Sequence, residues 1–124
     1  MSMEVIFTVL GEPASKSNSR QLVRLNGRPA FIKSKKALDY VNSFKLQCKP
    51  LKNLMEGDLE VSIKIFYRSR RPDLDESVIL DCMQGLIYSN DRQVKQKHIF
   101  HGVDPDNPRS EITVRVLDLQ TTAG

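Results

Sequence analysis

Hydrophobic residues alternate with polar residues in several stretches of this chain, and that alternation predicts its strands. The clearest stretch is Leu59–Tyr67, in which Leu59, Val61, Ile63 and Ile65 share one face. Further runs rich in β-branched and aromatic residues predict three more strands, at Glu4–Leu10, Gln93–His101 and Ser110–Leu117.

A β-hairpin is predicted between these strands. Gln21–Leu25 and Arg28–Ile32 flank the dipeptide Asn26-Gly27. Both central residues of a type I′ turn need a positive φ, which asparagine and glycine adopt more readily than other residues. The dipeptide is therefore a strong local signal for two antiparallel strands joined by a tight turn.

A helix over Lys35–Lys49 is predicted from apolar residues at helical spacing. Ser34 can cap its first turn, and Pro50 ends it. Its expected inward face consists of Ala37, Leu38, Val41, Phe44 and Cys48.

A second, short helix is predicted from Asp75 or Glu76 to Gln84, with Gly85 as its left-handed end. Its expected inward residues are Val78, Ile79, Cys82 and Met83. The elements together predict an α+β fold: a mainly antiparallel or mixed sheet with two helices packed on one face, in a single domain over residues 1–124.

Length and composition add few constraints to this picture. A chain of 124 residues with 40% hydrophobic residues is ordinary for one globular domain. No apolar run approaches the roughly 18 residues of a membrane span, and no basic segment precedes an apolar one at the N-terminus. We therefore expect a cytoplasmic protein without a membrane partner. Cys48 and Cys82 lie among apolar residues and are expected to be reduced core residues.

The net charge of +4 is unevenly distributed. Up to Lys52 the chain has ten basic and three acidic residues, a net +7, so the remainder carries −3. A basic half beside an acidic centre fits a polyanionic partner together with a cation site, although an ordinary solvated surface would give a similar count.

Three aspartates are the candidates for that cation site. Asp73 and Asp75 stand two residues apart after a predicted strand, so their carboxylates would lie on one side, and Asp91 follows on a turn after the short helix. Such closely spaced like charges need neutralising, and Mg²⁺ is a hard cation held by one or two carboxylates and water. The alternative is that Asp73 and Asp75 complement a helix dipole and Asp91 occupies a simple turn.

Five neighbouring residues are further candidates for a role near this site. Lys95 and Lys97 would share one strand face, where they could contact phosphate or stabilise a transition state. His98 and His101 would lie on opposite faces, which argues against a shared metal. Asp81, in the short helix, is expected to face solvent.

The candidates for binding a nucleic-acid backbone are basic residues of the first half and those around the three aspartates. They are Lys16, Arg20, Arg68, Arg70, Arg71, Lys95 and Lys97.

Four segments together resemble the RusA family of Holliday-junction resolvases. They are Gly11–Lys16, Arg71–Asp75, Leu80–Tyr88 and Asn90–Val94. The resemblance implies a homodimeric, Mg²⁺-dependent endonuclease of phage or prophage type that acts in DNA recombination and repair. Such an enzyme places paired nicks across a four-way junction of branched DNA. It also implies catalytic, metal-binding roles for Asp73, Asp75 and Asp91.

The chain departs from the family pattern at the short helix. Glu76 stands where asparagine is usual, and the helix is about two residues shorter than usual and lacks the family's lysine. Lys16, Lys95 or Lys97 could supply the missing positive charge, and Glu76 could be an added metal ligand.

Two other functions remain open from the residues alone. One is a nuclease of the PD-(D/E)-x-K type, with Pro72-Asp73 and a catalytic Lys95. The other is a non-catalytic module that binds DNA or RNA through its basic first half.

Overall fold

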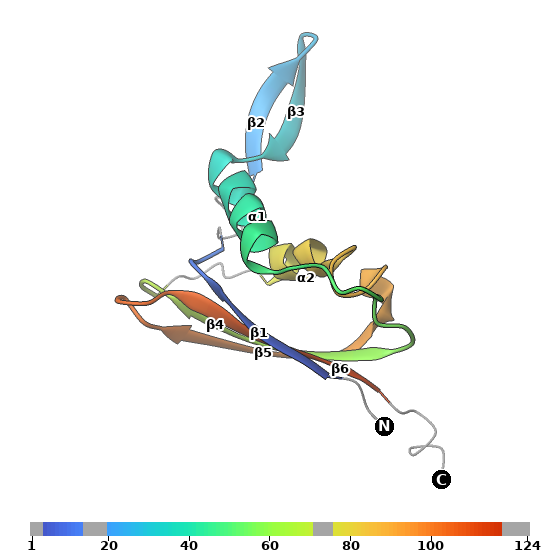
Figure 1. Cartoon of the computed structure of the whole chain (residues 1–124). Helices are drawn as coiled ribbons and strands as arrows, with labels where there is room; N and C mark the ends of the chain where they lie inside the picture. Colours follow the sequence, from blue (N-terminus) through green and yellow to red (C-terminus); the bar gives the residue numbers. More distant parts are fainter. Residues whose placement is uncertain (1–3, 14–19, 71–75, 118–124) are drawn as a thin grey trace.

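A four-stranded sheet with two helices on one face forms the body of the molecule (Figure 1). The computed structural model describes residues 4–13, 20–70 and 76–117. The spatial order of the strands is β1 (Glu4–Leu10), β6 (Arg109–Val116), β4 (Leu59–Tyr67) and β5 (Val94–Val103). The β1–β6 and β6–β4 pairs are antiparallel, whereas β4 and β5 run parallel. The predicted α+β class with a mixed sheet is confirmed.

The central strand β4 supplies the middle of the core. Leu59, Val61, Ile63 and Ile65 are completely buried, as their alternation predicted, and Tyr67 continues the same face. Side chains of β6 and of both helices pack on this face. The register of the sheet is therefore fixed, because a shift by one residue would turn the buried face of β4 toward solvent.

The first helix, α1 (Lys35–Gln47), begins as predicted and ends two residues early. The Ser34 hydroxyl accepts a hydrogen bond from the Ala37 amide at 3.2 Å. The prediction that Leu38 points inward was wrong, since its side chain is 47% exposed. Tyr40 is buried instead, because it lies three residues after Ala37 and four before Phe44 on one helix face.

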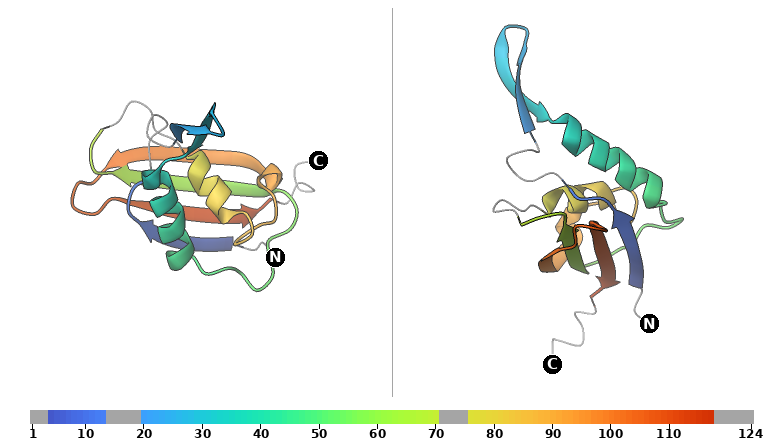
Figure 2. Two further views of the ribbon diagram at one scale, coloured as in Figure 1. Left: turned by 90° about the horizontal axis from the view of Figure 1, so that it is seen from above. Right: turned by 90° about the vertical axis from the view of Figure 1, so that its left-hand side faces the viewer.

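The second helix, α2 (Ser77–Met83), is shorter than predicted at both ends. Ile79, Cys82 and Met83 are buried as expected, and Leu80 is buried as well. Gly85 follows with φ 83°, which confirms its left-handed conformation. α2 lies in the connection between the parallel strands β4 and β5, and it covers the same face of the sheet as α1 (Figure 2).

The hairpin does not join the main sheet. Its strands, β2 (Arg20–Leu25) and β3 (Arg28–Lys33), form a separate two-stranded sheet that projects from the start of α1 (Figures 1 and 2). Asn26 and Gly27 have φ values of 54° and 78°, so both central residues have the positive φ of the predicted turn.

Both cysteines are free and buried, as predicted. Burial raises the pKa of the Cys82 thiol to about 11, so it remains protonated near neutral pH. Within the described ranges, no helix is both long enough and apolar enough to cross a membrane.

Candidate active site

The candidate active site lies around the chain segment that connects β4 to α2. Its two predicted carboxylates, Asp73 and Asp75, fall outside the described residues, as do Lys16 and Arg71. In the part of the chain that the structure describes, no three acidic, histidine or cysteine side chains lie close enough to hold a metal ion. The described residues therefore give the surroundings of the predicted metal cluster, and the cluster itself stays a prediction.

Glu76 and Lys97 form an ion pair beside this segment. The Lys97 Nζ lies 3.4 Å from Glu76 Oε1, and Glu76 is the first described residue after Asp75. Lys97 stands opposite Val61 in the β4–β5 register, so it extends from the helix-covered side of the sheet. The side chain of Lys97 is 45% exposed, which leaves its ammonium group accessible to a further anion.

Lys95 occupies a different structural position. The β4–β5 register shifts after Leu59, which pairs with Val94, whereas the next residue, Glu60, pairs with Gln96. Lys95 is therefore the extra residue of a β-bulge. The prediction that Lys95 and Lys97 share a face assumed regular alternation along the strand, and the bulge interrupts that alternation at Lys95.

Asp91 begins the short 3₁₀ helix η2 (Asp91–Gln93), which leads into β5. Asn90 caps this turn by accepting a hydrogen bond from the Arg92 amide at 2.9 Å. The Asp91 amide donates to the Gln84 side chain at 3.1 Å, which ties the turn to the end of α2. Hydrogen bonds thus hold the backbone at Asp91, while Asp91 itself is exposed to solvent.

Gln93, part of the Asn90–Val94 segment that resembles the family, fixes the position of this turn, a role that was not predicted from the sequence. Its side-chain oxygen accepts hydrogen bonds from the backbone amides of Ser89 and Asn90, at 3.2 and 3.1 Å. Its side-chain nitrogen donates to the carbonyls of Met55 and Gly57, at 2.9 and 3.0 Å. The available signal was the spacing of Asn90 and Gln93, which is that of a capping box.

The negative charges of Asp81 and Asp91 both act on the buried hydroxyl of Tyr88. The Tyr88 hydroxyl donates to the Leu80 carbonyl at 2.7 Å. Burial is the main cause of its raised pKa, and the negative charges of Asp91 and Asp81 raise that pKa further. Asp81 is exposed, as predicted, so two solvent-accessible carboxylates lie near one tyrosine.

Glu12 anchors the end of β4 where the chain enters the undescribed segment. One of its carboxylate oxygens accepts a hydrogen bond from the Arg68 amide at 2.8 Å. Its other oxygen lies 3.8 Å from the Lys36 ammonium of α1, and its side chain is only 11% exposed. Glu12 lies two residues after β1, Lys36 lies in α1 and Arg68 directly follows β4, so Glu12 is a positioning residue that links the ends of three elements.

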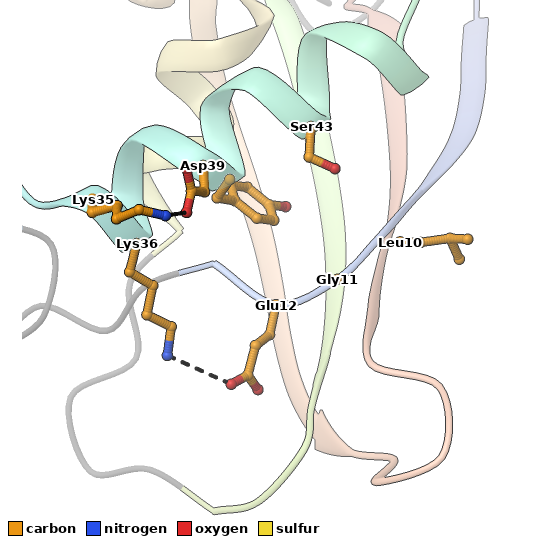
Figure 3. A pocket seen from close by; sticks show the side chains of 8 residues that line it. Leu10, Gly11, Glu12, Lys35, Lys36, Asp39 and Ser43 are labelled. Carbon is orange, nitrogen blue, oxygen red and sulfur yellow. Dashed lines mark hydrogen bonds and ion pairs between the residues drawn. The ribbon is translucent and has the colours of Figure 1, made fainter.

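A hollow of about 550 Å³ lies beside this anchor, between the end of β1 and the exposed side of α1 (Figure 3). A second ion pair on α1, between Lys35 and Asp39 at 2.9 Å, borders it. The exposed residues Arg68 and Arg70 follow β4 directly, so this end of the sheet has several cations near its surface.

The two histidines lie on opposite sides of β5, as predicted. His98 hydrogen-bonds to Glu60 at 2.9 Å on the uncovered face of the sheet, where Arg115 also binds Glu60. These contacts, that of Arg115 first, lower the pKa of Glu60. His101 lies on the other face beside the Tyr67 ring, with ring centroids 6.0 Å apart. Neither histidine belongs to a metal cluster of the described residues.

A comparison with protein-family models matches residues 11–115 to the model described as Endodeoxyribonuclease RusA. The match begins directly after β1 and ends one residue before the end of β6, so it includes the hairpin, both helices and the Asp91 turn. No curated protein matches the chain.

Proposed function

This chain belongs to the RusA family of endodeoxyribonucleases, which resolve Holliday junctions, and from that premise we propose that it uses Mg²⁺ to place paired nicks across four-way DNA junctions. The family match over residues 11–115 is the observation that carries the proposal. The anchored Asp91 turn and the Glu76–Lys97 pair support it, because the turn holds the third proposed carboxylate and Glu76 directly follows Asp75 in the sequence.

The donor chemistry of the proposed site fits Mg²⁺. Asp91 offers an exposed carboxylate on a firmly held turn, and Asp73 and Asp75 would supply the other two carboxylates. All three are hard oxygen donors, which this ion prefers over nitrogen or sulfur. When bound there, the ion would polarise the scissile phosphate and lower the pKa of an attacking water.

Lys97 is proposed to provide the positive charge that the family places on the short helix. Its ammonium group can stabilise the negative charge that develops on the phosphate, while Glu76 holds the side chain in place. Under this assignment, Glu76 orients Lys97 and is not an added metal ligand. Further basic residues would hold the DNA strand on either side; the proposed contacts are Lys16, Arg20, Arg68, Arg70, Arg71 and Lys95.

Paired nicks require two active sites on one junction. We therefore propose that the enzyme acts as a homodimer whose two-fold axis coincides with that of the junction. Each subunit would cut one of two symmetry-related strands, which would separate the joined duplexes in DNA recombination and repair.

A synthetic four-way junction with one labelled strand tests this function. Wild-type protein should convert the junction to nicked duplexes in Mg²⁺ and leave it intact in EDTA, while it binds the junction in both. A cruciform plasmid should become linear, because paired nicks cut both strands, whereas unpaired nicks give an open circle. Tight, salt-sensitive binding with an intact junction at high protein and high Mg²⁺ would indicate the non-catalytic alternative.

Lys97→Ala should slow junction cleavage about 10- to 100-fold, the range observed when a group supporting a metal centre is lost. Single-turnover rates at saturating protein would isolate this effect from DNA binding. Lys95→Ala is the matched control, because it removes an equal charge from the neighbouring bulge, and it should retain most of the rate. The reverse order, with Lys95 indispensable and Lys97 not, would favour the PD-(D/E)-x-K mechanism.

A further inference from the structure

The β2–β3 hairpin is an arm without a packing partner in the described structure. Its two strands pair with one another from Arg20↔Lys33 to Leu25↔Arg28 and with no strand of the main sheet. Figure 1 shows the arm rising from the start of α1, away from the sheet, and the side view in Figure 2 confirms that it extends beyond the body.

Large apolar side chains on the arm face solvent. Phe31 is 70% exposed and Leu22 is 59% exposed, and the register places the two directly opposite one another on one face. Leu25 and Ile32 are 54% and 42% exposed on the other face. Concentrated apolar exposure of this kind on a soluble domain marks a binding surface.

The charge of the arm indicates which partner that surface fits. Residues 20–33 include four basic residues, Arg20, Arg24, Arg28 and Lys33, and no acidic residue. Arg24, Arg28 and Lys33 form no ion pair with any residue that the structure describes. Two such arms would repel one another. A polyanionic partner would neutralise the cations, and its less polar groups could contact the apolar residues.

The arm is also well placed relative to the candidate active site. Burial raises the pKa of the Cys82 thiol in α2, and the positive charge of Lys33 opposes part of that rise. Lys33, at the base of the arm, therefore lies near α2. α2 is the helix that follows the segment with Asp73 and Asp75. A strand of six residues spans roughly 20 Å, and a two-stranded ribbon fits the major groove of B-DNA, which is about 12 Å wide.

We propose that residues 20–33 form a wedge that enters branched DNA, with Arg24 and Arg28 on the phosphates and the Leu22–Phe31 pair against unstacked bases at the branch point. The inference rests on the proposed function, because it takes the four-way junction as the ligand. Apolar side chains of other proteins separate base steps in this way, and bases stack on aromatic rings with little dependence on sequence. A branch point offers such bases, since stacking is already interrupted there.

The test is to replace the apolar pair while keeping the strands. Leu22→Thr combined with Phe31→Thr retains β-forming residues but removes the wedge. Junction affinity, measured in EDTA, should fall about 5- to 150-fold, the range for losing one stacked base. A 2-aminopurine at the branch point should brighten when wild-type protein binds and remain quenched with the double variant. Phe31→Tyr should preserve both signals, because it keeps the ring.

Ile6→Thr is the matched control, because Ile6 is also 70% exposed on a strand but lies in β1 of the main sheet. It should bind the junction like the wild type. Arg24→Gln combined with Arg28→Gln should weaken binding to junction and duplex alike and lower the salt dependence by about two counterions.

The arm and the function can fail separately. If the wild type cuts junctions but the double threonine variant binds and brightens 2-aminopurine normally, the wedge is wrong and the function stands. If that variant changes a dimer into a monomer by light scattering, the arm binds a second copy of the chain and the wedge is again overturned. A wild type that neither binds nor cuts junctions overturns both proposals.

Discussion

Asp91→Asn should bind a four-way junction at least as tightly as the wild type. Its rate of cleavage should fall by at least about 1000-fold. Asparagine has nearly the same shape, and the backbone contacts that hold the turn do not involve the carboxylate: Asp91 donates to Gln84 through its amide, and Asn90 caps Arg92. The substitution therefore removes one negative charge and one metal ligand while the turn persists. Loss of that charge also relieves repulsion of the DNA phosphates, which is why binding should hold or tighten.

Binding and cleavage have to be measured separately for this prediction. Junction affinity in EDTA and single-turnover cleavage in Mg²⁺, both with purified protein, would do so. Asp106→Asn is a suitable control, because Asp106 is an exposed aspartate in the turn before β6 and lies outside the stretch of sequence from Asp73 to Lys97. The control should cut at the wild-type rate. An Asp91→Asn protein that cuts within a few-fold of wild type would show that this carboxylate is not a ligand.

Phe44→Ala should lower the free energy of unfolding by about 3–5 kcal/mol, the usual cost of emptying a buried aromatic site. Phe44 is completely buried and meets Phe7 of β1 edge-on, with ring centroids 6.1 Å apart. Tyr40, at 6.2 Å, contacts it from within α1. The ring therefore attaches α1 to the sheet. Small domains unfold with only about 5–15 kcal/mol in total, so this single change would remove a large share of the stability.

Urea denaturation followed by circular dichroism would measure the loss. Leu46→Ala provides the comparison, because Leu46 lies two residues away on the same helix but is 85% exposed. Its effect should stay within about 0.5 kcal/mol. Equal losses for the two variants would contradict the packing described for Phe44.

Elements with a strong local signal were predictable from the sequence. The alternation in β4 gave its bounds and its buried face, and Asn26-Gly27 gave the hairpin turn, because both signals act over a few neighbouring residues. The buried side of α1 was harder to predict, since Leu38 and Tyr40 lie only two positions apart and only the position of the sheet decides which of them is buried.

Features that depend on distant contacts were not predictable. The separation of the hairpin from the main sheet follows from strand pairing that no local pattern encodes. Glu12 and Arg68 are 56 positions apart, and Glu76 and Lys97 are 21 apart, so their contacts appear only in the folded chain. The bulge at Lys95 likewise arises from the fit of two strands. The three aspartates Asp73, Asp75 and Asp91 could be identified in the sequence as candidate metal ligands, but the metal site that they would form together remains a prediction.

The parallel pairing of β4 and β5 has a consequence for how the proposed catalytic apparatus could evolve. In the sequence, Asp73, Asp75, Asp91 and Lys97 all fall between the start of β4 and the end of β5, the two parallel strands that α2 connects. β5 is the last strand of the sheet, so this unit has a free flank and shares only β4 with the remaining strands. Lengthening or shortening its connections would therefore alter the spacing of the reactive groups without disturbing the rest of the scaffold.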